Sequence, residues 1–537
     1  MTPIRPAERL RLPVHNGHSL LAGLRRAHAQ PVLTLGETAL TGAEVLDATA
    51  RYITVLRHHG IDSGAPLGIL ALNRPEVLFT IAAGQLRGHR RTALHPLGGV
   101  DDHAHILDDA GITTLILDPH PAFVARVREL LDRVPSLTKV LVLGPVPAEL
   151  ARVGVDLTAE AAALRRVDPV TVAELPPDHV VSVTYTGGTT GRPKGVIGTA
   201  LGMTTMTQIM LAEWEWPRRP RFLLCTPLSH AGAAFFLPTI LRGGRLVVLP
   251  RFDAGAVLAA IEEHRISATM LVPSMLYALL DHPDFPRRDL SSLEVVYYGA
   301  SAIDPGRLRQ AIDRMGPIFA QYFGQSEAPM AISYLARDEH DEDRLTSCGR
   351  PSAMLRTALL GPAGAPVARG EAGEICVSGP LLALGYRNLP EVTAQTFRDG
   401  WLYTGDLARE DEDGFLHIVG RSKDMIVTGG FNVFAREVED VIAADPQVAA
   451  VTVVGVPDPA WGEAVTALVV PATSAAQDRS ARDELAARLV ATVRERKGPV
   501  HAPKHVLFVD AIPLTALGKP DKVASRATAA AILGVSS

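Results

Sequence analysis

Residues 183 to 196 read VTYTGGTTGRPKGV and combine glycines, threonine hydroxyls and one lysine within a few positions. The β-branched run before the glycines predicts a strand that leads into a loop. Glycine lets successive backbone N–H groups point at one anion, while the hydroxyls and the ammonium group add donors and positive charge. We therefore predict a phosphate-binding loop, with the candidate residues Thr186, Gly187, Gly188, Thr189, Thr190, Gly191 and Lys194.

Two other kinds of phosphate loop do not fit this stretch. It lacks the Gly-Lys-Ser/Thr sequence of the Walker loop, and its glycines fall at other offsets than those of the dinucleotide-binding fingerprint. A surface turn rich in glycine and threonine is the alternative. We favour the phosphate loop because several other turns also place polar or glycine residues directly after an apolar strand.

Those turns belong to a repeated alternation of strand and helix. Buried strands are predicted in the segments APLGILALNR, ITTLILDP, KVLVLGP, RFLLCTPLSH, GGRLVVLP, ISATMLVPSML and LEVVYYGASAI. The alternation predicts a mostly parallel, layered α/β sheet, in which ligands collect at the carboxyl ends of the strands. We expect Ser229 and His230 in one cleft formed by the turns 186–195, 226–232, 298–302 and 322–328.

The composition limits the class of protein. A chain of 537 residues is too long for one compact core, and a formal charge of -5 without long basic runs predicts no binding to nucleic acid. The N-terminal residues are not apolar enough for a secretory signal, and no apolar run reaches bilayer length, so we expect no membrane insertion. Three widely spaced cysteines, Cys225, Cys348 and Cys376, predict reduced thiols and a cytoplasmic location.

Four histidines lie close together in the sequence: His89, His95, His103 and His105. None of their spacings matches a known ligand pair with a third ligand nearby. We therefore interpret them as surface histidines or as core histidines with hydrogen-bond partners, and we expect no metal site among them.

The pattern changes after residue 356 to short strands with close turns, which predicts a small antiparallel sheet or barrel up to residue 420. A compact α+β unit follows, with a helix near 435–444, the strands AAVTVVGVP and EAVTALVVP, a polar linker over 473–484, another helix and a final strand HVLFVDAIP. We predict a large N-terminal domain (1–420), a hinge (421–424) and a small C-terminal domain (425–537).

Eight short motifs follow one another along the chain: YTGGTTGRPKG, PLSHAG, YYGASA, YFGQSEAP, GEICVSG, YTGD, GRSKDMIVTGGFNV and PLTALGKPDK. The ordered set resembles the adenylate-forming superfamily of acyl- and aryl-CoA synthetases, carrier-protein-loading adenylation domains and firefly luciferase. The resemblance implies an adenylation domain of layered α/β sheets with a β-barrel-like subdomain, and a mobile α+β C-terminal lid. It also implies ATP, Mg²⁺ and CoA as cofactors, a small acid as substrate, and a monomer or homodimer.

The same resemblance implies roles in phosphate binding. The loop from Thr186 to Lys194 would hold the β- and γ-phosphates of ATP, Glu327 would ligate Mg²⁺, and Ser326 would contact the α-phosphate. Positive charge is needed at such a site because the acid carboxylate must approach an anionic phosphate. The alternative for Glu327 is a carboxylate at a helix N-terminus.

Adenosine recognition is implied in the same way. Asp406 would accept hydrogen bonds from both ribose hydroxyls, and Arg421 would reach the ribose and the phosphates. The remaining nucleotide-binding candidates are Gly299, Ala300, Ser301, Tyr322, Phe323, Gly324, Gln325, Ile418 and Gly430. Phe323 replaces a tyrosine and Gly187 a serine that are common in the family.

The C-terminal unit would carry the second group of functional residues. Lys519 resembles the family's catalytic lysine, Lys423 matches the hinge position, and the loop 429–430 would shape a tunnel for pantetheine. His230 would gate the acid pocket or contact the acyl carboxylate, with a hydrogen-bonded core histidine as the alternative. Trp461 would stack on the CoA adenine or, alternatively, be buried and anchor two strands.

We expect ATP-dependent adenylation of a fatty or aromatic acid, followed by transfer of the acyl group to CoA. The alternatives are adenylation with another acceptor, such as a carrier protein or an amine, including diazotase chemistry with nitrite, and a non-catalytic ATP-binding regulator. The acid pocket is expected at 231–236, 297–302 and 328–332, whose small and aromatic residues suit a medium-chain or an aromatic acid.

Overall fold

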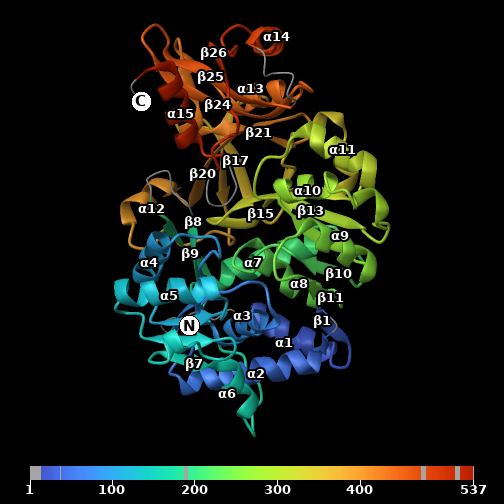
Figure 1. Ribbon diagram of the computed structural model, residues 1–537, viewed down its shortest axis with the longest axis vertical. Coiled ribbons are helices and arrows are strands. Elements are labelled where there is room, and N and C mark those ends of the chain that lie inside the picture. Colours follow the sequence, from blue (N-terminus) through green and yellow to red (C-terminus); the bar gives the residue numbers. More distant parts are fainter. Residues whose placement is uncertain (1–13, 37, 187–191, 473–478, 515–519, 536–537) are drawn as a thin grey trace, which may run out of the picture.

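The computed structural model describes residues 14–36, 38–186, 192–472, 479–514 and 520–535. The molecule contains four sheets: the two large ones lie side by side, and the C-terminal sheet lies at one end of the long axis (Figure 1). The predicted layered α/β fold with a smaller β subdomain and an α+β C-terminal unit is confirmed.

The first large sheet has nine strands in the order β16-β15-β14-β13-β12-β10-β11-β1-β2. Its central strands are parallel, and β2, β15 and β16 are antiparallel to their neighbours. The strands are β1 (Pro31–Leu35), β2 (Thr38–Thr41), β10 (Arg221–Leu224), β11 (Arg245–Val248), β12 (Ala268–Leu271), β13 (Val295–Gly299), β14 (Phe319–Gln325), β15 (Ala328–Leu335) and β16 (Arg350–Pro351).

The second large sheet has seven strands in the order β7-β6-β5-β3-β4-β8-β9, of which only β9 is antiparallel. The strands are β3 (Pro66–Leu70), β4 (Arg90–Ala93), β5 (Thr114–Leu117), β6 (Lys139–Val142), β7 (Gly154–Asp156), β8 (Val180–Thr186) and β9 (Lys194–Thr199). The predicted phosphate loop therefore connects two antiparallel strands, which the sequence alone did not indicate.

Helices separate the two sheets and cover their outer faces. They are α1 (Asn16–Arg26), α2 (Gly42–His58), α3 (Pro75–Arg87), α4 (Val100–Asp109), α5 (Pro121–Arg133), α6 (Leu157–Ala163), α7 (Ala200–Glu213), α8 (Phe236–Leu241), α9 (Ala254–Glu263), α10 (Pro273–Leu280) and α11 (Pro305–Met315). Local sequence explains their ends: Thr41 and Glu44 form a capping box at the start of α2, and Gly88 ends α3 with a φ of 72°.

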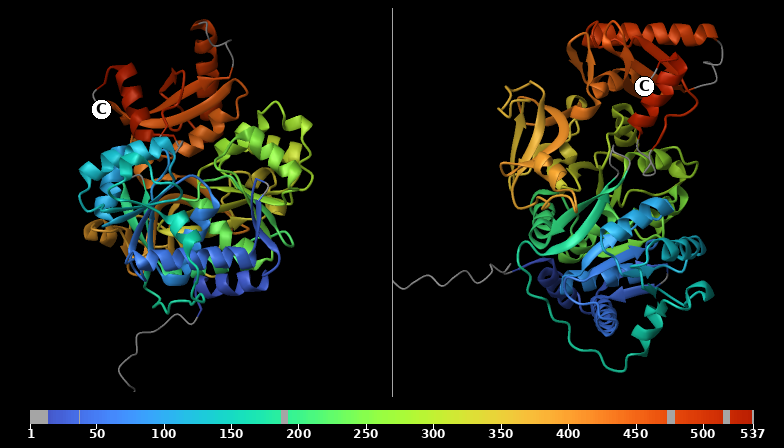
Figure 2. Two further views of the ribbon diagram at one scale, coloured as in Figure 1. Left: turned by 60° about the horizontal axis from the view of Figure 1, so that its bottom comes forward. Right: turned by 90° about the vertical axis from the view of Figure 1, so that its left-hand side faces the viewer.

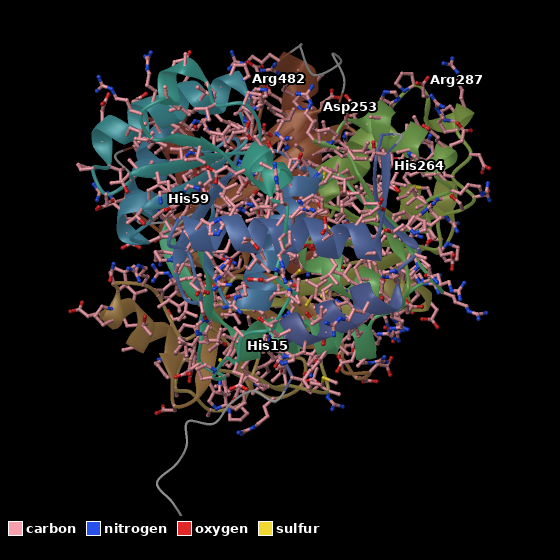
Figure 3. All side chains as sticks on the ribbon, turned by 90° about the horizontal axis from the view of Figure 1, so that it is seen from below. His15, His59, Asp253, His264, Arg287 and Arg482 are labelled. Carbon is pink, nitrogen blue, oxygen red and sulfur yellow. The ribbon has the colours of Figure 1, made fainter. Side chains whose placement is uncertain are left out.

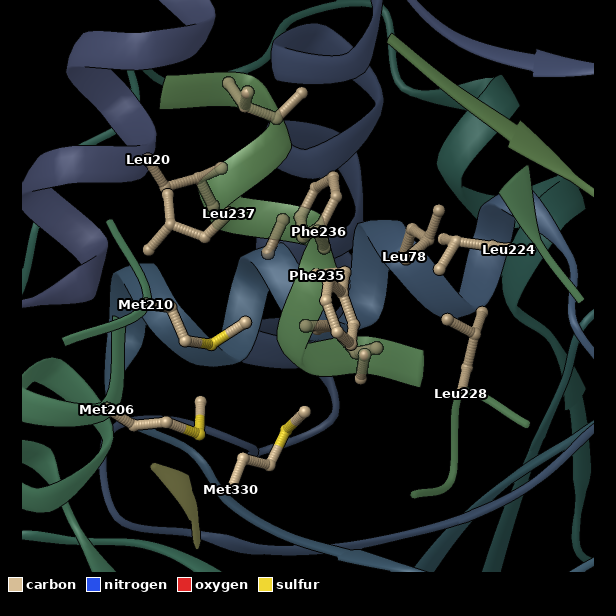
Figure 4. Packing of buried hydrophobic residues seen from close by; sticks show 14 of the residues in the cluster. Leu20, Leu78, Met206, Met210, Leu224, Leu228, Phe235, Phe236, Leu237 and Met330 are labelled. Carbon is tan, nitrogen blue, oxygen red and sulfur yellow. The ribbon is translucent and has the colours of Figure 1, made fainter. Parts of the chain in front are cut away.

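One hydrophobic core joins the two large sheets. It includes Leu20 of α1, Leu78 of α3, Met206 of α7 and Phe236 of α8, together with inward-facing strand residues such as Leu224. Figure 4 shows these side chains packed around the chain segment that carries Phe235 and Phe236. Seen from below, α1 and α2 run across the ends of both sheets (Figure 3). Because many apolar side chains are buried between the two large sheets, the sheets are held in one orientation relative to each other.

A third sheet follows in the chain and is antiparallel, as predicted. Its strands are β17 (Arg356–Leu360), β18 (Gly373–Ser378), β19 (Phe397–Arg398), β20 (Trp401–Glu410) and β21 (Leu416–Arg421), with the helix α12 (Pro390–Thr396) before β19. The chain then passes through the 3-10 turn Ser422–Asp424 and enters the fourth sheet at Ile426. The chain therefore passes from the third sheet to the fourth at the predicted hinge (421–424). Movement about this hinge stays a prediction.

The C-terminal unit lies at one end of the molecule (Figures 1 and 2). It consists of β22 (Ile426–Thr428), β23 (Phe431–Val433), α13 (Ala435–Ala443), β24 (Val448–Asp458), β25 (Gly462–Pro471), α14 (Arg479–Lys497), β26 (His505–Phe508) and α15 (Lys522–Leu533). The polar linker predicted over 473–484 is wrong from Arg479 onward, because Leu485, Leu489 and Val493 give α14 a buried stripe. Arg436 of α13 donates a hydrogen bond to the carbonyl oxygen of Ile303 in the large part at 2.9 Å.

Among the described residues, no helix combines the length and hydropathy that a membrane-spanning segment needs. The three cysteines are buried and unpaired, which agrees with the prediction of reduced thiols.

Gly349 connects the first and third sheets and leaves no room for a side chain. Its φ is +88°, and a Cβ atom would lie 2.1 Å from the Tyr334 carbonyl group. We predict that Gly349→Ala lowers the free energy of unfolding by about 3 kcal/mol, from backbone strain and overpacking together. Gly60→Ala is the matched control, because Gly60 has a φ of +78° with nothing within 4 Å of a Cβ. Equal shifts in the midpoint of urea unfolding for both variants would contradict the prediction.

Candidate active site

The Asp406 carboxylate lies where the first and third sheets meet. Its residue is 5% exposed, and Arg421 Nε lies 2.7 Å from Oδ1. Gln325, the last residue of β14, donates from Nε2 to Asp406 Oδ2 at 2.9 Å and to the Thr404 carbonyl oxygen at 3.1 Å. Burial by itself lowers the pKa of Arg421, but the Asp406 carboxylate raises that pKa above its ordinary value. The sequence-predicted residues Gln325, Asp406 and Arg421 therefore form one hydrogen-bonded group.

A local irregularity in β20 turns Asp406 toward this group. Gly405 has a φ of +73°, a conformation that favours glycine, and its N–H donates to Glu374 at 2.7 Å. The Thr404 hydroxyl accepts from the Asp406 N–H at 3.1 Å and donates to the Ile375 carbonyl oxygen at 2.7 Å. The Thr-Gly-Asp sequence therefore supplies a strand bulge that turns the buried Asp406 carboxylate toward Gln325 and Arg421.

Glu327 lies in the tight turn between β14 and β15, next to Ser326. It is 8% exposed, and the Tyr386 hydroxyl donates to its Oε1 at 2.5 Å. Burial and the Glu327 charge both raise the pKa of Tyr386 above its ordinary value, so the tyrosine stays a donor. Gly324 is required at the start of this turn, because a Cβ atom there would lie 2.4 Å from the backbone nitrogen of Met330.

Tyr386 also connects Glu327 to the phosphate-loop hairpin. Lys194 Nζ lies 5.3 Å from the centre of the Tyr386 ring, and Tyr386 forms a β-bridge with Val196. Thr186 and Lys194 are paired across the base of the hairpin. The five loop residues predicted to hold phosphate, Gly187, Gly188, Thr189, Thr190 and Gly191, lie outside the described residues. Of the predicted loop, only its two flanks can therefore be placed.

The end of β13 has the close packing expected of a nucleotide slot. A Cβ atom on Gly299 would lie 2.4 Å from the Tyr322 carbonyl oxygen, and Ala300 has a φ of +65° before Ser301. The Tyr322 ring is buried and stacked on Trp214 with 5.3 Å between ring centres. Adjacent strand residues point to opposite faces, so Phe323 points away from the face on which Tyr322 packs against Trp214.

Two other nucleotide candidates lie farther along the chain. Ile418 is on β21 opposite Ala408, three residues before Arg421. Gly430 lies in the turn between β22 and β23 with a φ of +81° and nothing within 4 Å of a Cβ atom. The roles of Ile418 and Gly430 in nucleotide binding stay predictions.

His230 meets a residue of the other large sheet. The Ser229 hydroxyl and His230 Nδ1 lie 2.9 Å apart, and the rings of His230 and His95 are in edge contact with 4.8 Å between their centres. His95 follows β4, so the turn after β4 also meets the turn after β10, which the sequence did not indicate. His230 is exposed, which excludes the alternative of a core histidine.

The structure describes some of the candidate functional residues of the C-terminal part of the chain. Lys519 lies outside the described residues. Trp461 is 43% exposed and covered on one side by Lys504, whose Nζ lies 4.3 Å from the ring centre, so the interpretation as a buried anchor is wrong. The Gly429 N–H donates to the Trp461 carbonyl oxygen at 2.7 Å. Burial and the neighbouring Arg421 charge lower the pKa of Lys423 in the 3-10 turn.

The described residues contain no group of three His, Cys, Asp or Glu side chains that could hold a metal ion by themselves. Of the four N-terminal histidines, His103 bonds the His95 carbonyl oxygen at 3.0 Å. His89 is buried, and neither of its ring nitrogens has a hydrogen-bond partner among the described residues, so the interpretation as a core histidine with such a partner is wrong for His89. A divalent cation at Glu327 would need further oxygen ligands, from water or from substrate phosphates.

Residues 23–387 match the sequence profile of the AMP-binding enzymes, and residues 437–519 match the profile of the AMP-binding enzyme C-terminal domain. The chain belongs to the AMP-binding enzyme family. This agrees with the resemblance to adenylate-forming enzymes.

Curated relatives in this family cover nearly the whole chain. A medium/long-chain-fatty-acid–CoA ligase of Mycobacterium tuberculosis, FadD8, is 63% identical over 97% of this chain and 91% of its own length. A feruloyl-CoA synthase of Amycolatopsis is 38% identical over 92% of this chain and 96% of its own length. The solved structure of the amide bond synthetase McbA from Marinactinospora thermotolerans has a TM-score of 0.85 at 35% identity and covers 95% of this chain and 99% of that one.

Sequence reasoning missed Tyr386, which this AMP-binding enzyme places between Glu327 and Lys194. Tyr386 and Glu327 are 59 residues apart in the chain, and the only local signal was the pair Gly385-Tyr386. No periodicity or spacing connects a hydroxyl to a carboxylate over that separation.

We predict that Tyr386→Phe lowers the rate of ATP–pyrophosphate exchange by about tenfold, because a hydrogen bond to a charged group contributes about 1.5–3 kcal/mol. Tyr403→Phe is the control, since its ring packs against Arg398 in the third sheet at 3.6 Å from the ring centre. If both variants exchange pyrophosphate at the wild-type rate, Tyr386 does not position Glu327.

Proposed function

We propose that this AMP-binding enzyme is an acid–CoA ligase that activates a medium- or long-chain fatty acid. In the first step the acid carboxylate attacks the α-phosphate of ATP and pyrophosphate leaves. In the second step the CoA thiolate attacks the acyl carbonyl, forming the thioester while AMP leaves. The observation that carries the proposal is the meeting of two buried carboxylates, Asp406 and Glu327, with the cations Arg421 and Lys194 at adjoining strand ends.

The charged side chains suit the two parts of a nucleotide: Asp406 would bind the ribose, and Lys194 would bind the phosphates. Asp406 would accept from the ribose hydroxyls, because Gln325 and Arg421 fix its orientation and a carboxylate has lone pairs for further donors. Lys194 and the loop that it follows would lie at the β- and γ-phosphates. An ammonium group held by the β8–β9 hairpin offsets the repulsion between the acid and the phosphates without further reorganisation.

Glu327 is the residue that fits a magnesium ion. Of the described side chains only Tyr386 donates to this carboxylate, and it uses Oε1. Mg²⁺ prefers oxygen ligands and is commonly held by one or two carboxylates together with substrate phosphates. When bound, the ion would neutralise negative charge on the phosphates as pyrophosphate leaves.

We choose a fatty acid over an aromatic acid because of the sequence identity to the relatives and because of the side-chain packing in the core. The relative with 63% identity is a fatty acid–CoA ligase, whereas the feruloyl-CoA synthase is 38% identical. Met206, Met210 and Met330 point toward a common region below Phe235 (Figure 4). Methionine side chains are unbranched and adapt to chains of different length. The aromatic residues of the core, such as Trp214, already stack on one another.

The substrate proposal is tested with the purified protein, ATP, Mg²⁺ and CoA, using saturated acids of increasing chain length, ferulate, and an aryl amine with nitrite. We expect AMP and an acyl-CoA thioester, identified by mass spectrometry, with aliphatic acids as the best substrates. Release of AMP with an amide or diazo product and no thioester would contradict the proposal. The predicted cytoplasmic location and monomeric or dimeric state are separate predictions that this assay does not address.

The two steps are proposed to use two orientations of the C-terminal unit about the 422–424 turn. Lys519 would contact the phosphates in the first step and leave them in the second, when the 429–430 turn would approach the pantetheine. We therefore predict that Lys519→Ala slows acyl-adenylate formation by about a hundred- to a thousandfold, the usual effect of removing one preorganised donor.

The measurement compares two assays of the same variant: pyrophosphate exchange, and thioester formation from synthetic acyl-AMP and CoA. We expect the second to proceed at nearly the wild-type rate. An equal loss in both assays would mean that Lys519 serves folding or general binding, and that the two orientations are not needed.

A further inference from the structure

Strand β9, which begins at Lys194, has a neighbour along each of its edges. β8 is antiparallel to it on one edge, with Tyr185 opposite Gly195. Residues 384–387 run along the other edge, where the Arg387 N–H donates to the Gly195 carbonyl oxygen at 2.7 Å. The backbone directly after Lys194 is therefore held from both sides.

Asp109, the last residue of α4, connects the two neighbours of β9. The Tyr185 hydroxyl donates to its Oδ2 at 2.5 Å, and Asn388 Nδ2 donates to its Oδ1 at 2.9 Å. The Asp109 carbonyl oxygen also accepts from Arg387 Nε. One half-buried residue therefore binds a residue of β8 and two residues of the segment on the other edge.

The Tyr185 side chain extends from Asp109 across β9. A Cβ atom on Gly195 would lie 2.8 Å from ring carbon Cζ of Tyr185 and 3.0 Å from its hydroxyl oxygen, so the phenol lies directly against the Gly195 backbone. Burial and the hydrogen bond to Asp109 raise the pKa of Tyr185 above its ordinary value, so the hydroxyl stays protonated and donates. Asp109 therefore fixes a ring that packs on the residue after Lys194.

A second residue of α4 contacts the chain on the other side of Lys194. His105 lies one turn before Asp109, and its Nε2 donates to the Pro193 carbonyl oxygen at 3.0 Å. Its ring is also in edge contact with the Tyr185 ring, with 6.3 Å between ring centres. Helix α4, which lies beside the hairpin (Figure 1), therefore supports the residue before Lys194 directly and the residue after it through Tyr185.

The stability of α4 does not explain an aspartate at this position. The partial negative charge at a helix C-terminus repels carboxylates, yet α4 ends with Asp108 and Asp109 and has no basic residue in its last turn. Asn388 has a φ of 55°, a conformation that is uncommon for a residue other than glycine. Such unfavourable features are typically retained at functional sites, and here both belong to the contacts that hold Gly195.

We propose that Asp109 is a positioning residue for Lys194. Through Tyr185 and through the segment 387–388 it holds the start of β9, and so places the Lys194 ammonium group at the β- and γ-phosphates of ATP. The inference rests on the proposed function, in which Lys194 binds these phosphates and Asp406 binds the ribose. Asp406 is held by other strands, β14 and β21. Removing the Asp109 carboxylate should therefore weaken the binding of a nucleotide only when that nucleotide carries β- and γ-phosphates.

The test measures binding without turnover, by titration calorimetry of the full chain with Mg²⁺ and without acid or CoA. The ligands are AMP and α,β-methylene-ATP, which the reaction cannot cleave. The variant is Asp109→Ala, and Asp108→Ala is the matched control because it removes the adjacent, exposed carboxylate at the same helix end. We expect Asp109→Ala to bind the ATP analogue about tenfold more weakly than wild type, since hydrogen bonds to a charged group are lost. Its affinity for AMP should stay within about twofold of wild type, as should both affinities of Asp108→Ala.

The two ligands separate a positioning role from a general structural role. Unchanged affinity of Asp109→Ala for the ATP analogue would show that the aspartate does not place Lys194, and would overturn the proposal. An equal loss of affinity for AMP and for the analogue would identify a structural residue, and would overturn it as well. Failure of wild type to bind either nucleotide would instead contradict the proposed function itself, so the two failures are distinguishable.

Two milder variants keep the test decisive if Asp109→Ala does not fold. Tyr185→Phe removes one donor to the carboxylate, and Asn388→Gly removes the other at a φ that glycine adopts without strain. We expect each to weaken binding of the ATP analogue by about two- to tenfold and to leave AMP binding unchanged. In the Asp109→Ala background neither should have a further effect, because the shared acceptor is already gone. Unchanged affinity of the double variant Tyr185→Phe/Asn388→Gly for the analogue would overturn the proposal.

Discussion

The ion pair between Asp406 and Arg421 is the interaction on which the candidate site depends. A buried carboxylate must be surrounded by donors, and here they come from β14 of the first sheet and β21 of the third. Arg421 is the last residue of β21, and the 422–424 turn that leads to the C-terminal unit follows it directly. The proposed ribose contact and the proposed hinge are therefore adjacent in the chain and share one side chain.

A second connection runs from the first sheet to the phosphate hairpin through Tyr386. Its hydroxyl fixes Glu327, its ring lies below Lys194, and its backbone is bridged to β9. Together the two connections hold one carboxylate for the ribose side and one for the phosphate side. The large core includes residues of all three sheets that meet at the site, and it therefore helps to fix the distance between the two carboxylates.

Much of this arrangement could be predicted from the sequence. Apolar runs such as LEVVYYG and TLIL predicted buried strands, and the resemblance to adenylate-forming enzymes singled out Thr-Gly-Asp and Gly-Gln-Ser-Glu. The β8–β9 hairpin was not predicted, because KGVIGT has glycines where an alternating strand would have side chains. Helix α14 was partly taken for a linker, because its buried stripe is narrow and most of its residues are polar.

Contacts between residues far apart in the chain could not be predicted. Tyr386 and Glu327 meet only through the third sheet, and the edge contact between His95 and His230 joins two different sheets. Spacing identifies residues suited to a chemistry, whereas burial and partners decide which of them can perform it.

The central claim is that Asp406 holds the ribose of a nucleotide at this junction. Titration calorimetry of AMP with wild type and with Asp406→Asn tests it most directly, with thermal unfolding to verify that both proteins are folded. The account predicts that Asp406→Asn weakens AMP binding by about 10- to 100-fold, because hydrogen bonds to a charged acceptor are lost, while 2′,3′-dideoxy-AMP binds both proteins with similar, weak affinity. Equal affinity of AMP for a folded Asp406→Asn variant and for wild type would contradict the account.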